Sequence, residues 1–409
     1  MLKIIIRSFS GQIILAAVLA LILVNLLPAS MLTPTNPLTH FIALGKLLYI
    51  GLLKMFVGIV VLFALLQGIT NLGSVVRLKT LGLKTLAIYS LTSSIAIAIG
   101  LSASLFMPKW QALNTVPKTE TFELISNHAS GSEIISHLLN MMLVNPFSAL
   151  GNNNLLAIVF FAILLGVALL ITLPEKHIIF DVINGINASI NNLISYVIKL
   201  APIAIFSIVF QFASTGNSHL FAELTHFSLW VVALTAFHGF VILPLLAKFL
   251  TGRKILPTLK KMMPPMALAF ATASSTATLP LTIQTATHSL GISKSTSSVV
   301  LPLGSILNMD GTALFEGVAA IFLAQIYGIE LGTTGIILVF LMSMLSSIGA
   351  PGMPSGSMSG MQLVLVTVGI PLEAIGILLL IERPLDTFRT SVNVEGDMIA
   401  AMIVDKWQR

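Results

Sequence analysis

The sequence has no cysteine and very little charge, since Asp, Glu, Lys and Arg together make up 9% of its 409 residues. The absence of cysteine excludes disulfides, thiolate metal sites and thiol catalysis. The chain is 56% hydrophobic and has a mean hydropathy of +1.00. A soluble protein of this length could not bury so much apolar surface in its core. These values predict an all-α polytopic membrane protein, with the lipid bilayer as its surroundings.

The net charge is +6, but the basic residues do not form a patch, because they alternate with apolar segments along the chain. We therefore expect no nucleic-acid partner and interpret the charge as a sign of membrane topology. Windows of spanning length fall near residues 11–28, 44–68, 82–107, 134–171, 178–212 and 225–249. If these windows alternate in direction, most Lys and Arg residues share one side. This predicts a multi-pass protein of the cell inner membrane with both termini in the cytoplasm.

Several apolar segments are interrupted by small polar residues. The 134–171 window contains Asn-Pro-Phe and a polar turn, and we expect it to be broken. Later interruptions fall at 271–280, 302–312, 346–360 and 382–397. They form two pairs, each a Ser/Gly/Pro-rich turn between apolar arms followed by an Asn-x-acid-Gly motif. Corresponding broken segments in two halves predict inverted repeats around the binding site of a transporter.

The segment 382–397 concentrates the charge that the rest of the chain lacks. Its five main polar side chains are spaced 4, 3, 4 and 4 residues apart, so on a helix they share one face: Glu382, Asp386, Arg389, Asn393 and Asp397. A charged side chain at the centre of a membrane costs roughly 3 kcal/mol. We therefore expect this face to look into protein, water or bound ions.

The pair Asp386 and Arg389 indicates the kind of solute. A guanidinium can bind a carboxylate through two hydrogen bonds, and Asp386, one turn away, supplies the opposite charge that an amino group needs. An acidic amino acid is therefore favoured over a plain dicarboxylate, which would have no use for Asp386. The alternative is an internal ion pair between residues i and i+3 of one helix.

Oxygen-rich groups suited to small cations lie near the first Asn-x-acid-Gly motif. Unwinding favoured by Pro302, Gly304 and Gly311 would turn Asn308, Asp310 and several carbonyls inward together. Asp397 could build a second cage of the same kind. Three hydroxyls in the third window share a helical face, those of Tyr89, Thr92 and Ser93. Alternatively, these hydroxyls bond to their own backbone or to a neighbouring helix.

Four motifs in this order give the sequence a specific resemblance. They are Ser274 to Pro280, Asn308 to Thr312, Ser347 to Pro354, and Asp386 to Asp397. In these motifs the chain resembles the glutamate transporter family, the dicarboxylate/amino acid:cation symporters, and Tyr89-x-x-Thr92-Ser93 fits the third helix of that family. The resemblance implies an elevator-type homotrimer whose subunits have eight transmembrane helices plus two re-entrant helical hairpins.

The resemblance also implies a division of the chain. Residues 1–75 would carry scaffold helices 1 and 2, and residues 108–212 scaffold helices 4 and 5. Residues 76–107 would form helix 3 of a moving transport domain. Residues 213–409 would supply the rest of that domain, namely helix 6, hairpin 1, helix 7, hairpin 2 and helix 8.

Site residues follow from the same resemblance. The amino acid substrate would be held by Ser275, Thr312, Met353, Asp386, Arg389, Thr390 and Asn393. Coupling sodium ions would be held in three sets: Gly304, Asn308, Asn393 and Asp397; then Tyr89, Thr92, Ser93, Asn308 and Asp310; then carbonyls at Ile306, Ser347, Ile348 and Ala350. No catalytic residue is implied.

Glu316 stands where family members with an acid move a proton with the substrate, which makes it a candidate for proton coupling. The alternative is a structural hydrogen bond to a neighbouring helix. The chain also departs from the family pattern. Glu382 stands where Asp is usual, and the arginine that pairs the substrate-binding Asp is absent from positions 273 and 387, which are Ala273 and Thr387.

Other functions remain as rivals at the level of sequence. Within the same family, the cargo could be a neutral amino acid or a C4-dicarboxylate. Outside it, Asp310 and Asp397 could share a proton as the dyad of an intramembrane aspartyl protease. The oxygen-rich segments could also line a cation channel. Two broken hairpins beside an Asp/Arg pair favour the transporter over both.

Overall fold

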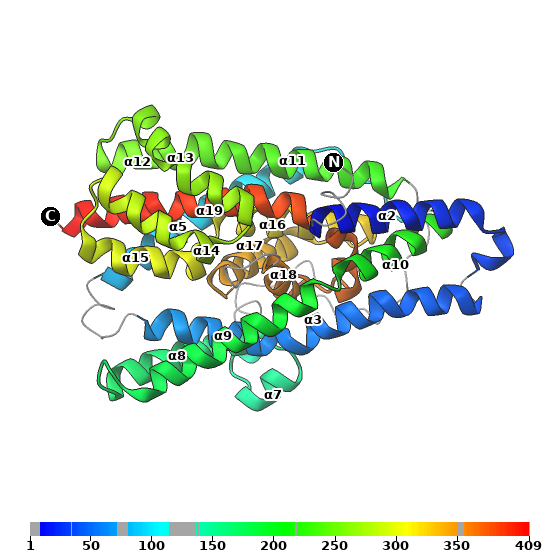
Figure 1. The fold of residues 1–409 in the computed structure, drawn as a ribbon, viewed down its shortest axis with the longest axis horizontal. Helices are drawn as coiled ribbons and strands as arrows, with labels where there is room; N and C mark the ends of the chain where they lie inside the picture. Colours follow the sequence, from blue (N-terminus) through cyan, green and yellow to red (C-terminus); the bar gives the residue numbers. More distant parts are fainter. Residues whose placement is uncertain are drawn as a thin grey trace.

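The computed structural model describes residues 9–33, 35–71, 81–113, 136, 139–216, 219–349 and 356–408. All regular secondary structure in these ranges is helical, as the composition predicts. The helices lie roughly along one long axis in two groups, which Figure 1 shows in sequence colours.

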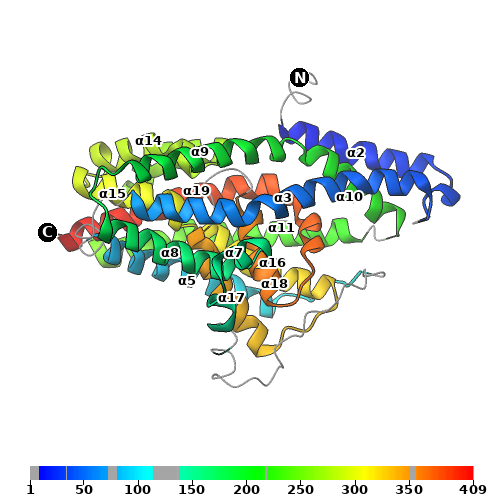
Figure 2. The same cartoon turned by 90° about the horizontal axis from the view of Figure 1, so that it is seen from below.

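The first group consists of helices from the N-terminal half. Its members are α2 (Phe9–Leu26), α3 (Pro37–Thr70), α7 (Pro146–Gly151), α8 (Leu155–Thr172), α9 (Ile178–Ile198) and α10 (Ala201–Ser214), with the short turn η1 (Ala29–Met31) after α2. Helix α3 packs against α8, α9 and α10, and α2 packs against α10. Figure 2 shows α3, α8 and α9 running side by side.

Local sequence explains where these helices begin and bend. Asn36 caps α3 by accepting a hydrogen bond from the Leu38 amide, and Pro37 follows as the first helical residue. Asn154 caps α8 in the same way, so the 134–171 window is broken as predicted. The window 178–212 also divides, because α9 and α10 meet at an angle of 42°.

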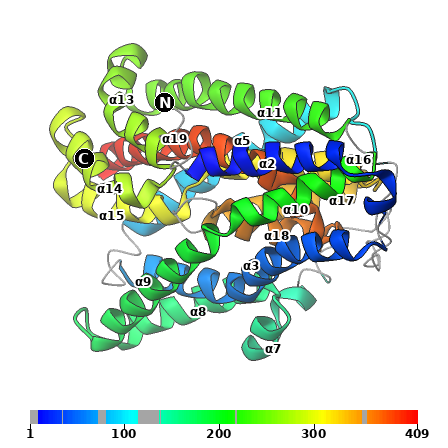
Figure 3. The same ribbon diagram turned by 45° about the vertical axis from the view of Figure 1, so that its right-hand side comes forward.

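The second group consists of α5 and the helices of the C-terminal half. Its members are α5 (Leu83–Phe106), α11 (Leu220–Phe237), η3 (His238–Ile242), α12 (Leu243–Thr251), α13 (Ile255–Thr272), α14 (Ser275–Gln284), η4 (Thr285–Ser289), α15 (Lys294–Leu307), α16 (Asp310–Ile326), α17 (Gly332–Gly349), α18 (Ser357–Thr367), η5 (Leu372–Ala374) and α19 (Ile375–Gln408). Although α5 precedes α7 in the chain, it packs against α16, α17 and α19. Figure 3 shows α19 among the helices of this group.

Two helix pairs correspond to the predicted hairpins. Helix α13 ends where Ala273 adopts a left-handed conformation with φ +50°, and Ser274 then caps α14. The chain therefore reverses within two residues, and α13 and α14 pack together. Helices α17 and α18 also pack together, but the segment that joins them, 350–355, lies outside the described residues.

The first Asn-x-acid-Gly motif interrupts a helix and the second does not. Helix α15 ends at Leu307 and α16 begins at Asp310, while Asn308 and Met309 leave the helical conformation with φ of −123° at both. The predicted unwinding is thus confirmed. Helix α19, in contrast, runs unbroken through Pro384 and the whole of 382–397. The fourth interruption therefore places polar residues in an apolar segment but does not break the helix.

Five of the described helical segments are long and apolar enough to cross a membrane, and the bent pair α9 and α10 would be a sixth. This supports a multi-pass membrane protein, whereas the full set of eight spanning helices and two re-entrant hairpins stays a prediction. Basic residues meet at one end of the molecule. Lys84 donates to the Trp407 carbonyl at 3.0 Å, and Lys406 donates to the Leu250 carbonyl at 3.1 Å.

Close packing of α16 on α19 depends on Gly311. A Cβ atom there would lie 2.8 Å from the Arg389 carbonyl oxygen and 2.9 Å from its Cα, and neither backbone atom can swing aside. We predict that Gly311→Ala destabilises the protein by about 1–3 kcal/mol. Gly185→Ala in α9 is the matched control, because a Cβ there meets nothing within 4 Å. Melting temperatures in detergent should fall for Gly311→Ala alone, and equal melting of the two variants would contradict this packing.

Candidate functional site

The polar face of α19 is buried inside the protein, as its spacing predicts. The exposed fractions of its five side chains lie between 0% and 5%: Glu382 2%, Asp386 5%, Arg389 0%, Asn393 4% and Asp397 2%. The surrounding protein comes from α5, α11 and α13 to α16, which all pack against α19. The site therefore lies in the interior of the second helix group.

Arg389 is the centre of this face. Its Nη2 donates to Glu382 Oε1 at 2.7 Å, to Asp386 Oδ1 at 3.2 Å and to Ser357 Oγ at 3.1 Å. Its guanidinium lies over the Phe315 ring at 4.0 Å. The buried Nε and Nη1 atoms have no hydrogen-bond partner among the described residues. Nη2 is therefore committed to protein, and Nη1 and Nε have donors to offer to a carboxylate.

Asp386 has an arginine partner that the sequence analysis missed. Arg383 Nη1 lies 4.0 Å from Asp386 Oδ2, one helical turn before it. An arginine on α19 therefore lies near Asp386, although neither position 273 nor position 387 carries one. The i, i+3 spacing of Arg383 and Asp386 was the available signal. The internal pair between Asp386 and Arg389, which was the alternative reading, is also present at 3.2 Å.

The remaining predicted substrate residues fall into two kinds. Asn393 joins α19 to α16, since its Oδ1 accepts from the Gly311 amide at 2.8 Å and its Nδ2 donates to Thr312 Oγ1 at 3.3 Å. Thr390 and Ser275 are buried but donate to backbone carbonyls, those of Asp386 at 2.8 Å and Ser305 at 2.9 Å. Met353 lies outside the described residues.

Asp310 sits in the predicted oxygen-rich cage. Its Oδ1 accepts from Ser93 Oγ at 2.8 Å and from Thr92 Oγ1 at 3.1 Å, and Thr92 also reaches Asn308 Oδ1 at 3.4 Å. The hydroxyl face of α5 therefore contacts the first Asn-x-acid-Gly motif. His238 was not predicted, yet its Nε2 lies 3.4 Å from Asp310 Oδ2 in a fully buried pair. No local pattern links His238, on η3, to Asp310.

A second part of the cage surrounds Asp397. Asn308 Nδ2 donates to Asp397 Oδ1 at 2.9 Å, so one amide connects the two parts. A Cβ atom at Gly304 would collide with Asp397 Oδ1, and the same Cβ atom would lie 2.7 Å from Tyr89 Oη. Tyr89 itself donates to the Val300 carbonyl at 2.6 Å. Glycine at 304 therefore lets the carboxylate and the phenol approach the end of α15.

Two residues of the third predicted set, Ile306 and Ser347, lie beside this cluster. Ile306 precedes the break between α15 and α16, and Ser347 Oγ donates to the Met344 carbonyl at 2.8 Å. A cavity of about 10 Å³ is lined in part by Tyr89, Ser93 and Ser347, which is close to the space that one water molecule needs. Ala350 lies outside the described residues, and the side chain of Ile348 is not described.

Glu316 is fully buried on α16 between the arms of the second helix pair. Its Oε1 accepts from Ser346 Oγ of α17 at 2.8 Å, whereas its Oε2 has no partner among the described residues. A Cβ at Gly360 of α18 would lie 2.6 Å from Oε1. The structural hydrogen bond of the alternative interpretation is therefore present, proton coupling stays a prediction, and Oε2 has no donor among the described residues.

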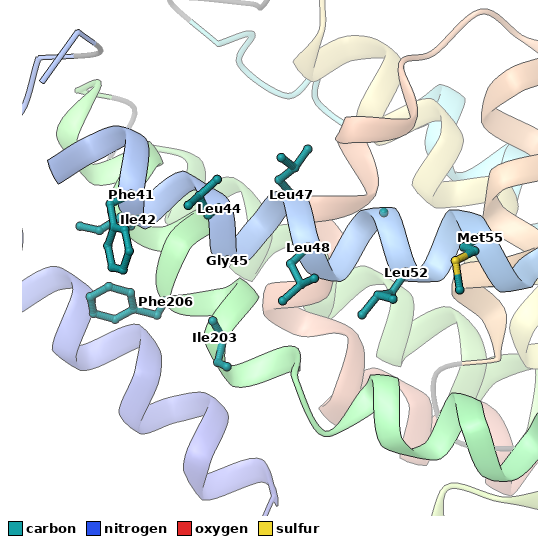
Figure 4. A pocket seen from close by; sticks show the side chains of 11 residues that line it. Phe41, Ile42, Leu44, Gly45, Leu47, Leu48, Leu52, Met55, Ile203 and Phe206 are labelled. Atoms are coloured by element: carbon teal, nitrogen blue, oxygen red, sulfur yellow. The ribbon is translucent and has the colours of Figure 1, made fainter. Parts of the chain in front are cut away.

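A groove of about 730 Å³ lies on the first helix group, apart from the polar cluster (Figure 4). Side chains of α3 and α10 line it, among them Phe41, Leu48, Ile203 and Phe206. All of the lining residues are apolar or glycine. The groove therefore offers no group that would hold a charged solute.

Comparison with known proteins agrees with the geometry. A family model described as the sodium:dicarboxylate symporter family matches residues 9–407. The chain is 30% identical over 365 residues to the proton/sodium-glutamate symport protein of Geobacillus stearothermophilus, covering 88% of this chain and 86% of that protein. It is 29% identical over 417 residues to the proton/glutamate-aspartate symporter of Escherichia coli (strain K12), covering 98% and 93%.

A third relative has a different printed substrate. The neutral amino acid transporter B(0) of Mus musculus is 33% identical over 275 residues, covering 67% of this chain. The match spans 50% of the length of that relative.

The cage around Asp310 gives a prediction for ion binding. Removing the Ser93 hydroxyl takes one oxygen from the cage, and we expect Ser93→Ala to weaken sodium binding about tenfold. Ser94→Ala is the control, because the Ser94 hydroxyl contacts Met344 Sδ at 3.7 Å and not Asp310. The measurement is the rise in melting temperature when sodium chloride replaces choline chloride. The same rise in both variants would show that Ser93 does not bind the ion.

Proposed function

Because the chain belongs to the sodium:dicarboxylate symporter family, we propose that it is a secondary active symporter that takes up an acidic amino acid, aspartate or glutamate, across the cell membrane. Sodium or proton gradients, or both, drive the uptake. The observation that carries this choice of cargo is the fully buried Arg389, whose Nε and Nη1 are without partners among the described residues. A protein of this kind is a transporter and not an enzyme.

Charge complementarity favours an acidic amino acid over the rival substrates. The side-chain carboxylate accepts a charge-assisted hydrogen bond from the unpaired Nη1 of Arg389, and the ammonium group binds Asp386. A neutral amino acid leaves the buried guanidinium without an acceptor, which is costly in a dry site. A C4-dicarboxylate brings no cation for Asp386. Thr312, Thr390, Asn393, Ser275 and the Met353 backbone complete the pocket.

Coupling to cations follows from the buried acids beside the pocket. Asp310 and Asp397 are 0% and 2% exposed and receive hydrogen bonds from neutral donors, namely two hydroxyls and one amide. Asp310 also lies 3.4 Å from His238, but Asp397 is contacted among the described residues by an amide. Burial of such a carboxylate is unfavourable, so a cation bound here stabilises the loaded state. Sodium fits such oxygen ligands, and the carbonyls of Ile306, Ser347, Ile348 and Ala350 supply a further site.

Asn308 and Asn393 connect ion binding to substrate binding. Asn308 contacts Asp397 and Thr92 of the cage, while Asn393 bonds the Gly311 amide next to Asp310. A cation that orders the break at 308–309 therefore also orders the Asn393 side of the pocket. This arrangement opposes the protease and channel readings, because Asp310 and Asp397 have separate partners.

Movement of the cargo follows an elevator mechanism in this proposal. Residues 1–75 and 108–212 form the scaffold, and residues 76–107 and 213–409 form the moving domain. The packing of α5 on α16, α17 and α19 supports this division. Lys54 on α3 forms an ion pair with Glu373 of η5 at 3.0 Å, which connects the two groups in the present conformation. The assembly is a homotrimer in the inner membrane, with both termini in the cytoplasm.

Uptake by the purified protein tests this function. Proteoliposomes with an inward sodium gradient, an inward proton gradient or neither should accumulate radiolabelled aspartate only when a gradient is present. Arg389→Ala should lower aspartate uptake by about a hundredfold, since it removes a charge-assisted hydrogen bond worth roughly 3 kcal/mol. Arg253→Ala, at the end of α12, is the control. Uptake of aspartate that needs no gradient, or that survives Arg389→Ala, would refute the proposal.

Proton coupling through Glu316 gives a separate prediction. If the loaded carrier crosses with Glu316 protonated, wild-type uptake rises as the external pH falls. Glu316→Gln mimics the protonated acid, so we expect its uptake to continue and to become independent of pH. The exposed Glu330, in the turn after α16, provides the control variant Glu330→Gln. An unchanged pH profile in Glu316→Gln would show that the proton is carried elsewhere.

A further inference from the structure

Ser357 connects the second helix pair to the substrate-binding arginine. It is the first residue of α18, and its side chain is buried, with 4% of its surface exposed. Its hydroxyl donates to Glu382 Oε1 at 2.7 Å and accepts from Arg389 Nη2 at 3.1 Å. Both partners belong to α19. A single hydroxyl therefore bridges the two members of a buried ion pair on the neighbouring helix.

The bridge engages the same group that receives the cargo. Glu382 Oε1 accepts from both Ser357 Oγ and Arg389 Nη2, so the three groups form a closed triangle of hydrogen bonds. Glu382 Oε2 is buried and has no partner among the described residues. Glutamate at this position has one methylene more than aspartate, and its Oε1 is the atom that contacts both groups. Without the hydroxyl, the ion pair would persist but would no longer bond to α18.

We propose that Ser357 is a positioning residue that closes α18 over the pocket when no cargo is bound. The inference rests on the proposed function. A symporter moves in both directions, loaded on the way in and empty on the way back. An open pocket that exposes Arg389, Glu382 and Asp386 is unfavourable at membrane depth. In the loaded carrier the cargo adds its own contacts to those that hold the hairpin arm, whereas in the empty carrier the Ser357 hydroxyl holds this arm on the guanidinium without them.

This role predicts different effects on two modes of transport, net uptake and exchange. Net uptake requires the empty carrier to return, whereas exchange of external for internal substrate uses the loaded carrier alone. Loss of the bridge should therefore slow net uptake and spare exchange. A residue needed only for folding or for cargo binding would change both rates together.

The test compares net uptake and exchange in the same batch of proteoliposomes. The probe is radiolabelled aspartate, taken up into vesicles without substrate or into vesicles filled with unlabelled aspartate. We expect Ser357→Ala to lower the ratio of net uptake to exchange about tenfold, as for one lost hydrogen bond to a charged group. Because both rates come from one preparation, the ratio does not depend on the amount of folded protein.

Two further variants complete the design. Ser357→Thr keeps the hydroxyl and should restore the wild-type ratio. Thr367→Val is the control on the same helix, because among the described residues the Thr367 hydroxyl bonds within α18, to the Leu363 carbonyl at 2.8 Å. A wild-type ratio in Ser357→Ala, or a proportional fall of both rates, would overturn the role of Ser357 and leave the proposed function intact. A wild-type protein that neither takes up nor exchanges aspartate would overturn both.

Discussion

The buried guanidinium of Arg389 is the constraint on which the rest of the site depends. A fixed positive charge inside an apolar helix bundle needs opposite charge and hydrogen-bond acceptors close by. Glu382 and Asp386 supply the charge, Ser357 supplies a hydroxyl, and the Phe315 ring faces the guanidinium plane. These partners come from three helices, so the conformations of α16, α18 and α19 are connected at one side chain. In the proposed symporter, the unused donors on Nη1 and Nε mark where the carboxylate of the cargo binds.

The same reasoning explains why ions accompany the solute. Two more buried acids, Asp310 and Asp397, lie beside the pocket in a cluster of hydroxyls, one amide and His238. In the proposed symporter, cations bound there add positive charge beside these acids, and the break at 308–309 offers backbone carbonyls as ligands. Substrate and ions thus share the structural elements that each must order, which is the physical basis of coupled transport.

Much of this site was predictable from the sequence, because it follows from spacing along one chain segment. The face of α19 follows from helical periodicity, and the unwinding before Asp310 follows from glycine and proline in an apolar segment. Contacts between distant segments were not predictable in this way. The bridge from Ser357 to Arg389 and the approach of His238 to Asp310 depend on how helices pack. Arg383 was missed for another reason. An arginine beside Asp386 was expected at position 273 or 387, whereas α19 carries one a helical turn before Asp386.

The most direct measurement of the central claim is an experimental structure of the protein with aspartate and sodium bound. The account predicts that the side-chain carboxylate of aspartate accepts a hydrogen bond from Nη1 of Arg389, at roughly 2.7–2.9 Å. The ammonium group should lie against Asp386, and Nη2 should still bind Glu382. Aspartate bound at another place, or an Arg389 side chain that points away from it, would contradict the account.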